Sequence, residues 1–120
     1  MDMTAELNDE WLESLLAGLG RTGDEVAGTL RDAGSRGTPT DIYGDPVAAY
    51  VGGRVRRLLP EAADIEVAAT ADEVVVCVYT IFPDYASREV AARTPEAVED
   101  FMVRFDARED YRDLEPDLAA

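Results

Sequence analysis

The chain has 120 residues, of which 26 are acidic and 11 are Arg, and with neither Lys nor His its formal charge is −15. So strong a negative charge repels nucleic acid, which argues against direct binding to DNA or RNA. Without His and Lys, the commonest general base, the Ser–His and Cys–His nucleophile pairs and Schiff-base chemistry are excluded, so we expect no enzyme unless carboxylates alone supply the chemistry.

Three helices are predicted in the first half of the chain. Asn8 caps a helix over 9–19, and Thr22 with Glu25 forms a capping box before a helix over 23–33. Asp45 followed by Pro46 predicts a third helix, which ends near residue 59. Apolar side chains cover nearly half of the first helix, so the apolar face of helix 9–19 must be covered by the fold or by a second copy in a homodimer.

The second half predicts a hairpin and a final helix. Residues 65–69 alternate in polarity and 74–82 are apolar on both faces, so the second strand is expected at the centre of a sheet with both faces covered. Residues 88–93 fit strand or helix, and we predict a weak third strand. Thr94-Pro95-Glu96 predicts a cap for the last helix. The expected fold is α+β, with three N-terminal helices, a β-hairpin or small three-stranded antiparallel sheet, and a C-terminal helix packed on one core.

The length fits a single acidic domain over residues 1–120, with flexible ends expected at about 1–7 and 113–120. Cys77 is the only cysteine, which favours a reducing compartment, and in its apolar run we expect it to be buried and inert. Residues 1–6 lack the basic start and apolar run of a signal peptide, and no apolar run is long enough to cross a bilayer. We therefore expect a cytoplasmic protein without membrane contact.

The third helix carries most of the one basic region, because residues 36–60 contain four Arg and only two acids. At 100° per residue, Arg54 falls within the apolar arc of this helix and Arg57 falls on its edge. A buried unpaired charge is costly, so an internal or interfacial ion pair is favoured over a site for an anionic ligand. Gly52 and Gly53 within the helix suggest close approach of the backbone to another element or chain.

The densest group of acids follows the last helix. It comprises Asp106, Glu109, Asp110, Asp113, Glu115 and Asp117. Because the group lacks the glycine and the spacing of an EF-hand loop, a solvated helix end is favoured over a cation site, and neither metal nor cofactor is expected. Tyr43, Tyr85 and Tyr111 lie in loops or at element ends, where an exposed Tyr can anchor a protein interface and a Tyr hydroxyl at the rim of the core is equally ordinary.

Two stretches of the chain contain motifs that point to a known family. Gly37-Thr38-Pro39, followed by Pro46-Val47-Ala48-Ala49-Tyr50, fits the run G-x-P … P-[LV]-A-x-Y. Phe101 through Asp106, followed by Tyr111-Arg112-Asp113-Leu114, fits the ending F-x-x-x-F-D … Y-x-D-L. Together they resemble the motifs of a family of small uncharacterised actinobacterial proteins. Members of that family often have Cys where this chain has Asp45. The resemblance implies a similar fold and, since these proteins have no assigned activity, it implies no site.

These observations favour a small acidic, non-enzymatic protein-interaction module, such as an adaptor, immunity protein or inhibitor, that docks on a basic partner surface. The candidate interaction or ion-pair residues are Arg54, Arg57, Asp106, Glu109, Asp110, Tyr111 and Asp113. One alternative is a nucleic-acid mimic, whose carboxylates would lie along one elongated face. The others are a carboxylate-based metal-binding protein or enzyme, and a structural protein that self-assembles through helix 9–19.

Overall fold

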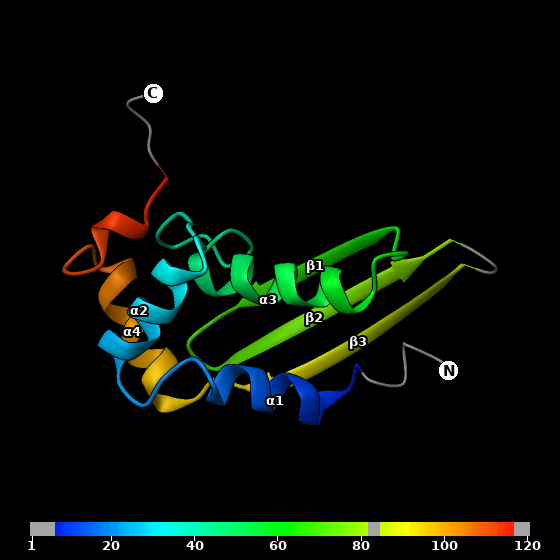
Figure 1. The fold of residues 1–120 in the computed structure, drawn as a ribbon, viewed down its shortest axis with the longest axis horizontal. Coiled ribbons are helices and arrows are strands. Elements are labelled where there is room, and N and C mark those ends of the chain that lie inside the picture. Colours follow the sequence, from blue (N-terminus) through cyan, green and yellow to red (C-terminus); the bar gives the residue numbers. More distant parts are fainter. Residues whose placement is uncertain (1–6, 82–84, 117–120) are drawn as a thin grey trace.

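The computed structural model describes residues 7–81 and 85–116 and has the predicted α+β fold (Figure 1). The elements in chain order are α1 (Asp9–Ala17), α2 (Gly23–Asp32), α3 (Pro46–Leu58), β1 (Asp64–Ala69), β2 (Glu73–Thr80), β3 (Ala86–Arg93), α4 (Glu96–Asp106) and the 3-10 helix η2 (Arg112–Leu114).

The three predicted caps of the N-terminal helices are confirmed. The side chain of Asn8 accepts a hydrogen bond from the Trp11 backbone N–H, and Thr22 accepts one from the backbone N–H of Glu25. Asp45 accepts from the Ala48 N–H at 2.7 Å, and Pro46 occupies the first turn of α3. Each cap satisfies a backbone donor that a helix start leaves without an intrahelical partner, so these short sequence signals position the helix starts.

The start of α4 differs from the prediction. The hydroxyl of Thr94 donates to the backbone oxygen of Thr70 at 2.7 Å, and Pro95 occupies the N-cap position without a side-chain bond. Thr94 is buried where β3 passes into α4. A buried hydroxyl needs a partner, and here the neighbouring strand turn supplies it in place of the helix.

The sheet is antiparallel with the order β1-β2-β3, so the second strand is central as predicted. Val76 pairs with Val67 of β1 and with Val90 of β3. Residues 88–93 form a strand, which begins two residues earlier than expected, at Ala86. Their own pattern is ambiguous, and pairing with the long, strongly β-forming β2 decides in favour of the strand.

Two helices cover one face of this sheet. Helix α1 packs on β3 and α3 packs on β1, whereas α2 and α4 pack against each other beyond one end of the sheet (Figure 1). Alternate residues of β2, namely Val74, Val76 and Val78, are buried beneath the helices. Leu12 and Leu16 of α1 are fully buried as well, so the chain itself covers most of the apolar face of helix 9–19.

The opposite face of the sheet is not covered by any described helix, so the expectation that β2 is buried on both faces is wrong. Val75 and Cys77 are only half-buried, and Tyr79 is exposed. The reason is tertiary, because α2 and α4 bury their apolar faces on each other instead of on the sheet. Partial burial and the nearby carboxylates of Glu89 and Glu66 raise the pKa of Cys77, which disfavours the reactive thiolate.

The expected flexible ends need correction at both boundaries. Leu7 is fully buried in the core. Asp113 pairs with Arg31, and Leu114 is buried and accepts a hydrogen bond from the backbone N–H of Gly37 at 2.9 Å. Side chains that pack into a core hold the backbone beside them in place. Leu7, Asp113 and Leu114 therefore do not belong to the predicted flexible ends. The rest of both predicted ends, 1–6 and 117–120, lies outside the described residues.

Candidate functional site

A groove of about 630 Å³ lies on the open face of the sheet, at the end where β2 leaves the sheet and β3 enters it. We call it the hairpin-end groove. The residues that line it are Ala63, Asp64, Glu66, Tyr79, Thr80, Ile81, Tyr85, Ala86 and Ser87. At this end the strands extend beyond α1 and α3, so the two helices leave the hairpin end uncovered (Figure 1).

Three large side chains in this groove face solvent. Tyr79 is 37% exposed, Ile81 54% and Tyr85 86%. Large apolar side chains scattered singly over a surface are ordinary, but several gathered in one groove are typical of a contact site. Tyr is also among the residues that dominate binding energy at protein interfaces.

Carboxylates border the same groove. Asp64 and Glu66 come from β1, and the hydroxyl of Tyr79 donates to Oε2 of Glu66 at 3.4 Å. The charge of Glu66 raises the pKa of Tyr79, because a negative neighbour disfavours the phenolate. The groove therefore combines apolar anchors with a negatively charged rim.

The acidic border continues along the open face of the sheet. Cys77 lies between Glu66 on β1 and Glu89 on β3, and Val75 lies between Ala68 and Ala91. The antiparallel register thus places a narrow apolar stripe along β2, with a carboxylate on either side of Cys77. A basic partner that reaches the groove would find further acids along this stripe.

The predicted acids after α4 mostly hold the fold together. Arg104 pairs with Asp110 at 2.9 Å, with Asp100 at 3.1 Å and with Asp24 at 3.4 Å. The hydroxyl of Tyr111 donates to Asp24 at 2.6 Å, and this bond is the main cause that lowers the pKa of Asp24. The hydrogen bond from Arg104 to Asp110 is the main cause that raises the pKa of Arg104. These contacts join α2, α4 and the chain before η2.

Three further acids of the predicted group have internal partners. Asp113 forms a bidentate pair with Arg31, with oxygens at 2.5 and 3.1 Å from Nε and Nη2. Asp106 accepts from the Thr40 backbone N–H at 2.9 Å, and Oε2 of Glu115 lies 3.7 Å from Nε of Arg112. Glu109 is exposed, and Asp117 lies outside the described residues. Within 7–81 and 85–116, no three His, Cys, Asp or Glu residues are placed to hold a metal ion.

Arg54 and Arg57 are exposed, and no carboxylate of the described chain forms an ion pair with either of them. An internal ion pair, one of the two expected kinds, is therefore not found among the described residues. The guanidinium carbon of Arg54 lies 5.3 Å from the centre of the Tyr50 ring, and Nη2 donates to the Tyr50 hydroxyl at 3.1 Å. The side chain of Arg is long enough to place its charged group in solvent even when its Cα lies on the apolar side of a helix.

Gly52 and Gly53 do not have the close backbone contact that the sequence suggested. A Cβ at Gly52 would lie 3.7 Å from Val67, an ordinary packing distance, and a Cβ at Gly53 would meet nothing within 4 Å. Helix α3 continues through both residues without a break. The fold therefore explains the small size of neither residue.

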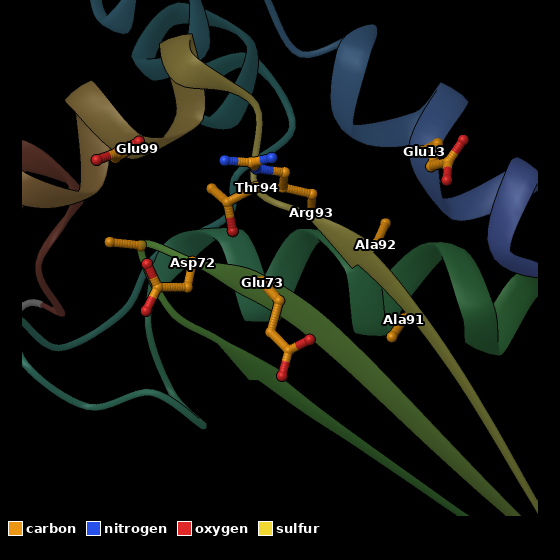
Figure 2. A pocket seen from close by; sticks show the side chains of 9 residues that line it. Glu13, Asp72, Glu73, Ala91, Ala92, Arg93, Thr94 and Glu99 are labelled. Atoms are coloured by element: carbon orange, nitrogen blue, oxygen red, sulfur yellow. The ribbon is translucent and has the colours of Figure 1, made fainter.

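A second concave site lies where α1, β2, β3 and α4 meet, and its volume is about 540 Å³ (Figure 2). Glu13 and Glu99 come from helices on opposite sides of Arg93, and the side chains of Asp72 and Glu73 point away from its guanidinium group (Figure 2). Two carboxylates that act as an acid–base pair, or that share a metal ion, must converge on one point. The arrangement in Figure 2 lacks that convergence.

Exposed carboxylates lie on several elements of the described chain. They occur on α1, on α4 and on the open face of the sheet, for example at Glu10, Glu99 and Glu89. The nucleic-acid-mimic hypothesis requires them on one elongated face, and this distribution does not favour it.

Within the described chain, no helix combines the length and the apolar character needed to span a membrane.

The sequence singles out only one of the three anchors in the hairpin-end groove. It places Tyr85 in a loop or at an element end without deciding between an exposed anchor and the core rim, and it places Tyr79 and Ile81 in a strand that is apolar on both faces. Helix lengths and helix–helix contacts decide which face of a sheet is covered, and a strand pattern contains neither.

Comparison with known proteins found no matching family model, no similar curated protein and no similar solved structure, so the motif resemblance does not assign this chain to a family.

Proposed function

We propose that this chain is a non-catalytic interaction module that docks on a basic protein surface through the hairpin-end groove. The observation that supports this proposal most strongly is the gathering of Tyr79, Ile81 and Tyr85, all exposed, in a groove bordered by Asp64 and Glu66. Apolar anchors surrounded by a polar rim are the usual anatomy of a protein interface.

The charge of the molecule determines which partners fit. A formal charge of −15 attracts positively charged surfaces and accelerates encounter with them at low salt. Once the complex forms, Tyr and Ile anchors lose water and supply most of the binding energy, while rim carboxylates mainly affect the association rate. The expected partner is therefore a protein with an apolar pocket or ridge surrounded by Lys and Arg.

A comparative capture experiment tests the anchors. A groove variant replaces Tyr79, Ile81 and Tyr85 with Thr, which suits strands, and a control variant replaces the exposed Ile42 and Tyr43 with Thr. Native, control and groove proteins are immobilised and incubated with lysate at about 50 mM and about 300 mM salt. We expect a set of basic proteins bound by the native and control proteins at low salt and lost with the groove variant. Equal capture by all three proteins would exclude the groove as the contact site.

Kinetics with a captured partner test the rim. Asp64→Asn together with Glu66→Gln removes two rim charges from the groove border and keeps the anchors. Rim charges steer encounter, so the association rate constant should fall and depend less on salt, with little change in the dissociation rate. A change confined to dissociation would place these carboxylates in direct buried contacts instead.

A further inference from the structure

A second groove, of about 610 Å³, lies between the end of α2 and the exposed side of α3, and we call it the Arg groove. The lining residues that matter here are Ser35, Arg36, Tyr50, Gly53, Arg54 and Arg57. Among the described residues, no acidic one lines it, although acids outnumber Arg 26 to 11 in the whole chain. The groove is thus a local concentration of positive charge on a strongly negative molecule.

Within residues 7–81 and 85–116, no carboxylate forms an ion pair with any of the three arginines in the Arg groove. The hydrogen bond from Arg31 is the main cause that lowers the pKa of Asp113, and the charge of Arg36 does help to lower it. Arginines outside the groove, such as Arg21 and Arg93, also form no ion pair among the described residues, so the distinguishing feature is the gathering of three arginines in one groove. Three cations that repel one another in a shared groove create a field that favours an anion between them.

One of these arginines is held in place. Tyr50 accepts a hydrogen bond from Arg54 at 3.1 Å, and its ring lies beneath the guanidinium group. Such a contact restricts the rotamers of the Arg54 side chain before any ligand binds. Binding then costs less side-chain entropy. Tyr50 is half-buried, so its ring also forms a firm wall of the groove.

Gly53 provides an independent indication. A Gly inside a helix is unfavourable relative to Ala, and a side chain at this position would meet no neighbouring atom. Packing therefore does not require the glycine. Gly53 is one of the lining residues, so its missing side chain leaves the Arg groove open at this position.

We propose that the Arg groove binds a small soluble molecule that carries a phosphate group. Guanidinium groups match the planar pairs of phosphate oxygens, and Ser35 and Tyr50 add hydroxyl groups. The volume lies in the range of small-ligand sites. The charge of −15 repels nucleic acids and anionic membranes as whole surfaces, so a small anion fits better than either. The proposal is independent of the hairpin-end groove, which lies on the open face of the sheet.

Nuclear magnetic resonance titration provides the test. Inorganic phosphate and glucose 6-phosphate are added to the whole chain at constant ionic strength, with sodium chloride as the reference. We expect saturable shifts of the backbone amides of Ser35, Arg36, Gly53 and Arg54, with tighter binding of the sugar phosphate. Shifts that chloride reproduces, or that do not saturate, would overturn the proposal.

Matched variants separate binding from folding. Arg54→Gln and Arg57→Gln should each weaken phosphate binding about tenfold, as expected for the loss of a charged hydrogen bond, whereas Arg21→Gln, outside the groove, should have no effect. Gly53→Met should raise the melting temperature and abolish binding, because it adds a helix-forming side chain to the groove. Gly28→Met, in open space on α2, should raise the melting temperature and leave binding intact. Unchanged affinity in Gly53→Met would overturn the proposal.

Two further arms identify the source of the phosphate. Vesicles that contain phosphatidic acid are tested by co-sedimentation, and a single-stranded DNA oligonucleotide is tested by fluorescence anisotropy. Neither should bind to the native chain. Binding of either probe more tightly than glucose 6-phosphate would overturn the assignment to a small soluble ligand.

Discussion

Asp45 combines two opposed roles in one side chain. It caps α3 through the Ala48 N–H, and it is almost fully buried. Burial, together with the charges of Asp106 and Asp41, raises the pKa of Asp45 to about 7, although the hydrogen bond from Ala48 opposes this shift. The carboxyl group can cap the helix in its neutral form, because its carbonyl oxygen still accepts the bond.

This raised pKa predicts a specific pH dependence of stability. An Asp whose pKa is raised by folding stabilises the native state fully below its unfolded pKa of about 4, and this contribution disappears as the pH rises to about 7. At about 1.4 kcal/mol per pKa unit, the loss amounts to as much as about 4 kcal/mol. Asp45→Asn keeps the cap and cannot ionise, so it should lack this slope.

Urea unfolding of both proteins between pH 4 and pH 8 tests the prediction. The difference in unfolding free energy between the native protein and the D45N variant cancels the contributions of all other carboxylates. We expect D45N to be the more stable protein at pH 8. A pH-independent difference would mean that Asp45 keeps an ordinary pKa.

At the scale of elements, the loop between α2 and α3 depends on one glycine. A Cβ at Gly37 would clash with backbone atoms of Gly44, Asp45 and Pro46. The loop closes through a bond from the Thr38 N–H to the Gly44 oxygen, and Gly37 also bonds to Leu114. Gly37 therefore joins the start of α3 to the C-terminal part of the fold.

Alanine substitutions of two glycines should have opposite effects. Gly37→Ala forces backbone apart and should lower the unfolding free energy by about 2–3 kcal/mol. Gly28→Ala lies in α2 with no atom within 4 Å of the new methyl group, so it should raise stability by about 0.5–1 kcal/mol. Chemical denaturation of both variants gives the two values. A Gly37→Ala protein as stable as the native chain would refute the clash.

At the scale of the molecule, repulsion among 26 acids opposes the compact state. The internal pairs of Arg104 and Arg31 offset part of this repulsion. Repulsion among the excess carboxylates outweighs the attraction within these few exposed ion pairs. Salt screens both interactions, so added salt should remove more repulsion than attraction. We therefore expect the melting temperature to rise between about 50 mM and about 500 mM sodium chloride.

A charge variant provides the control for this salt effect. Glu10→Lys with Glu13→Lys changes two exposed residues of α1 and lowers the net negative charge. Its melting temperature should depend less on salt than that of the native chain. An equal salt dependence in both proteins would show that ion-specific effects, and not charge repulsion, cause the change.

The sequence predicts the positions of the helices and strands well. The predicted caps at Asn8, Thr22 and Asp45 are confirmed, because each signal acts within three or four residues of the helix start. The predicted cap over Thr94-Pro95-Glu96 lacks a side-chain bond to the helix, because the Thr94 hydroxyl bonds to Thr70, which is distant in sequence. A local pattern contains no information on such a partner.

Composition and short-range pattern alone determined the fold class, the strong negative charge and the order of the elements, because each depends on chain chemistry or on neighbouring residues. Only the tertiary structure decided that α1 and α3 share one face of the sheet and that the other face stays open. It also decided that Tyr79 and Ile81 reach solvent, and that Arg36 joins Arg54 and Arg57 of α3 in one groove. Side chains become neighbours or become exposed through packing between elements, which the periodicity of a single element does not specify.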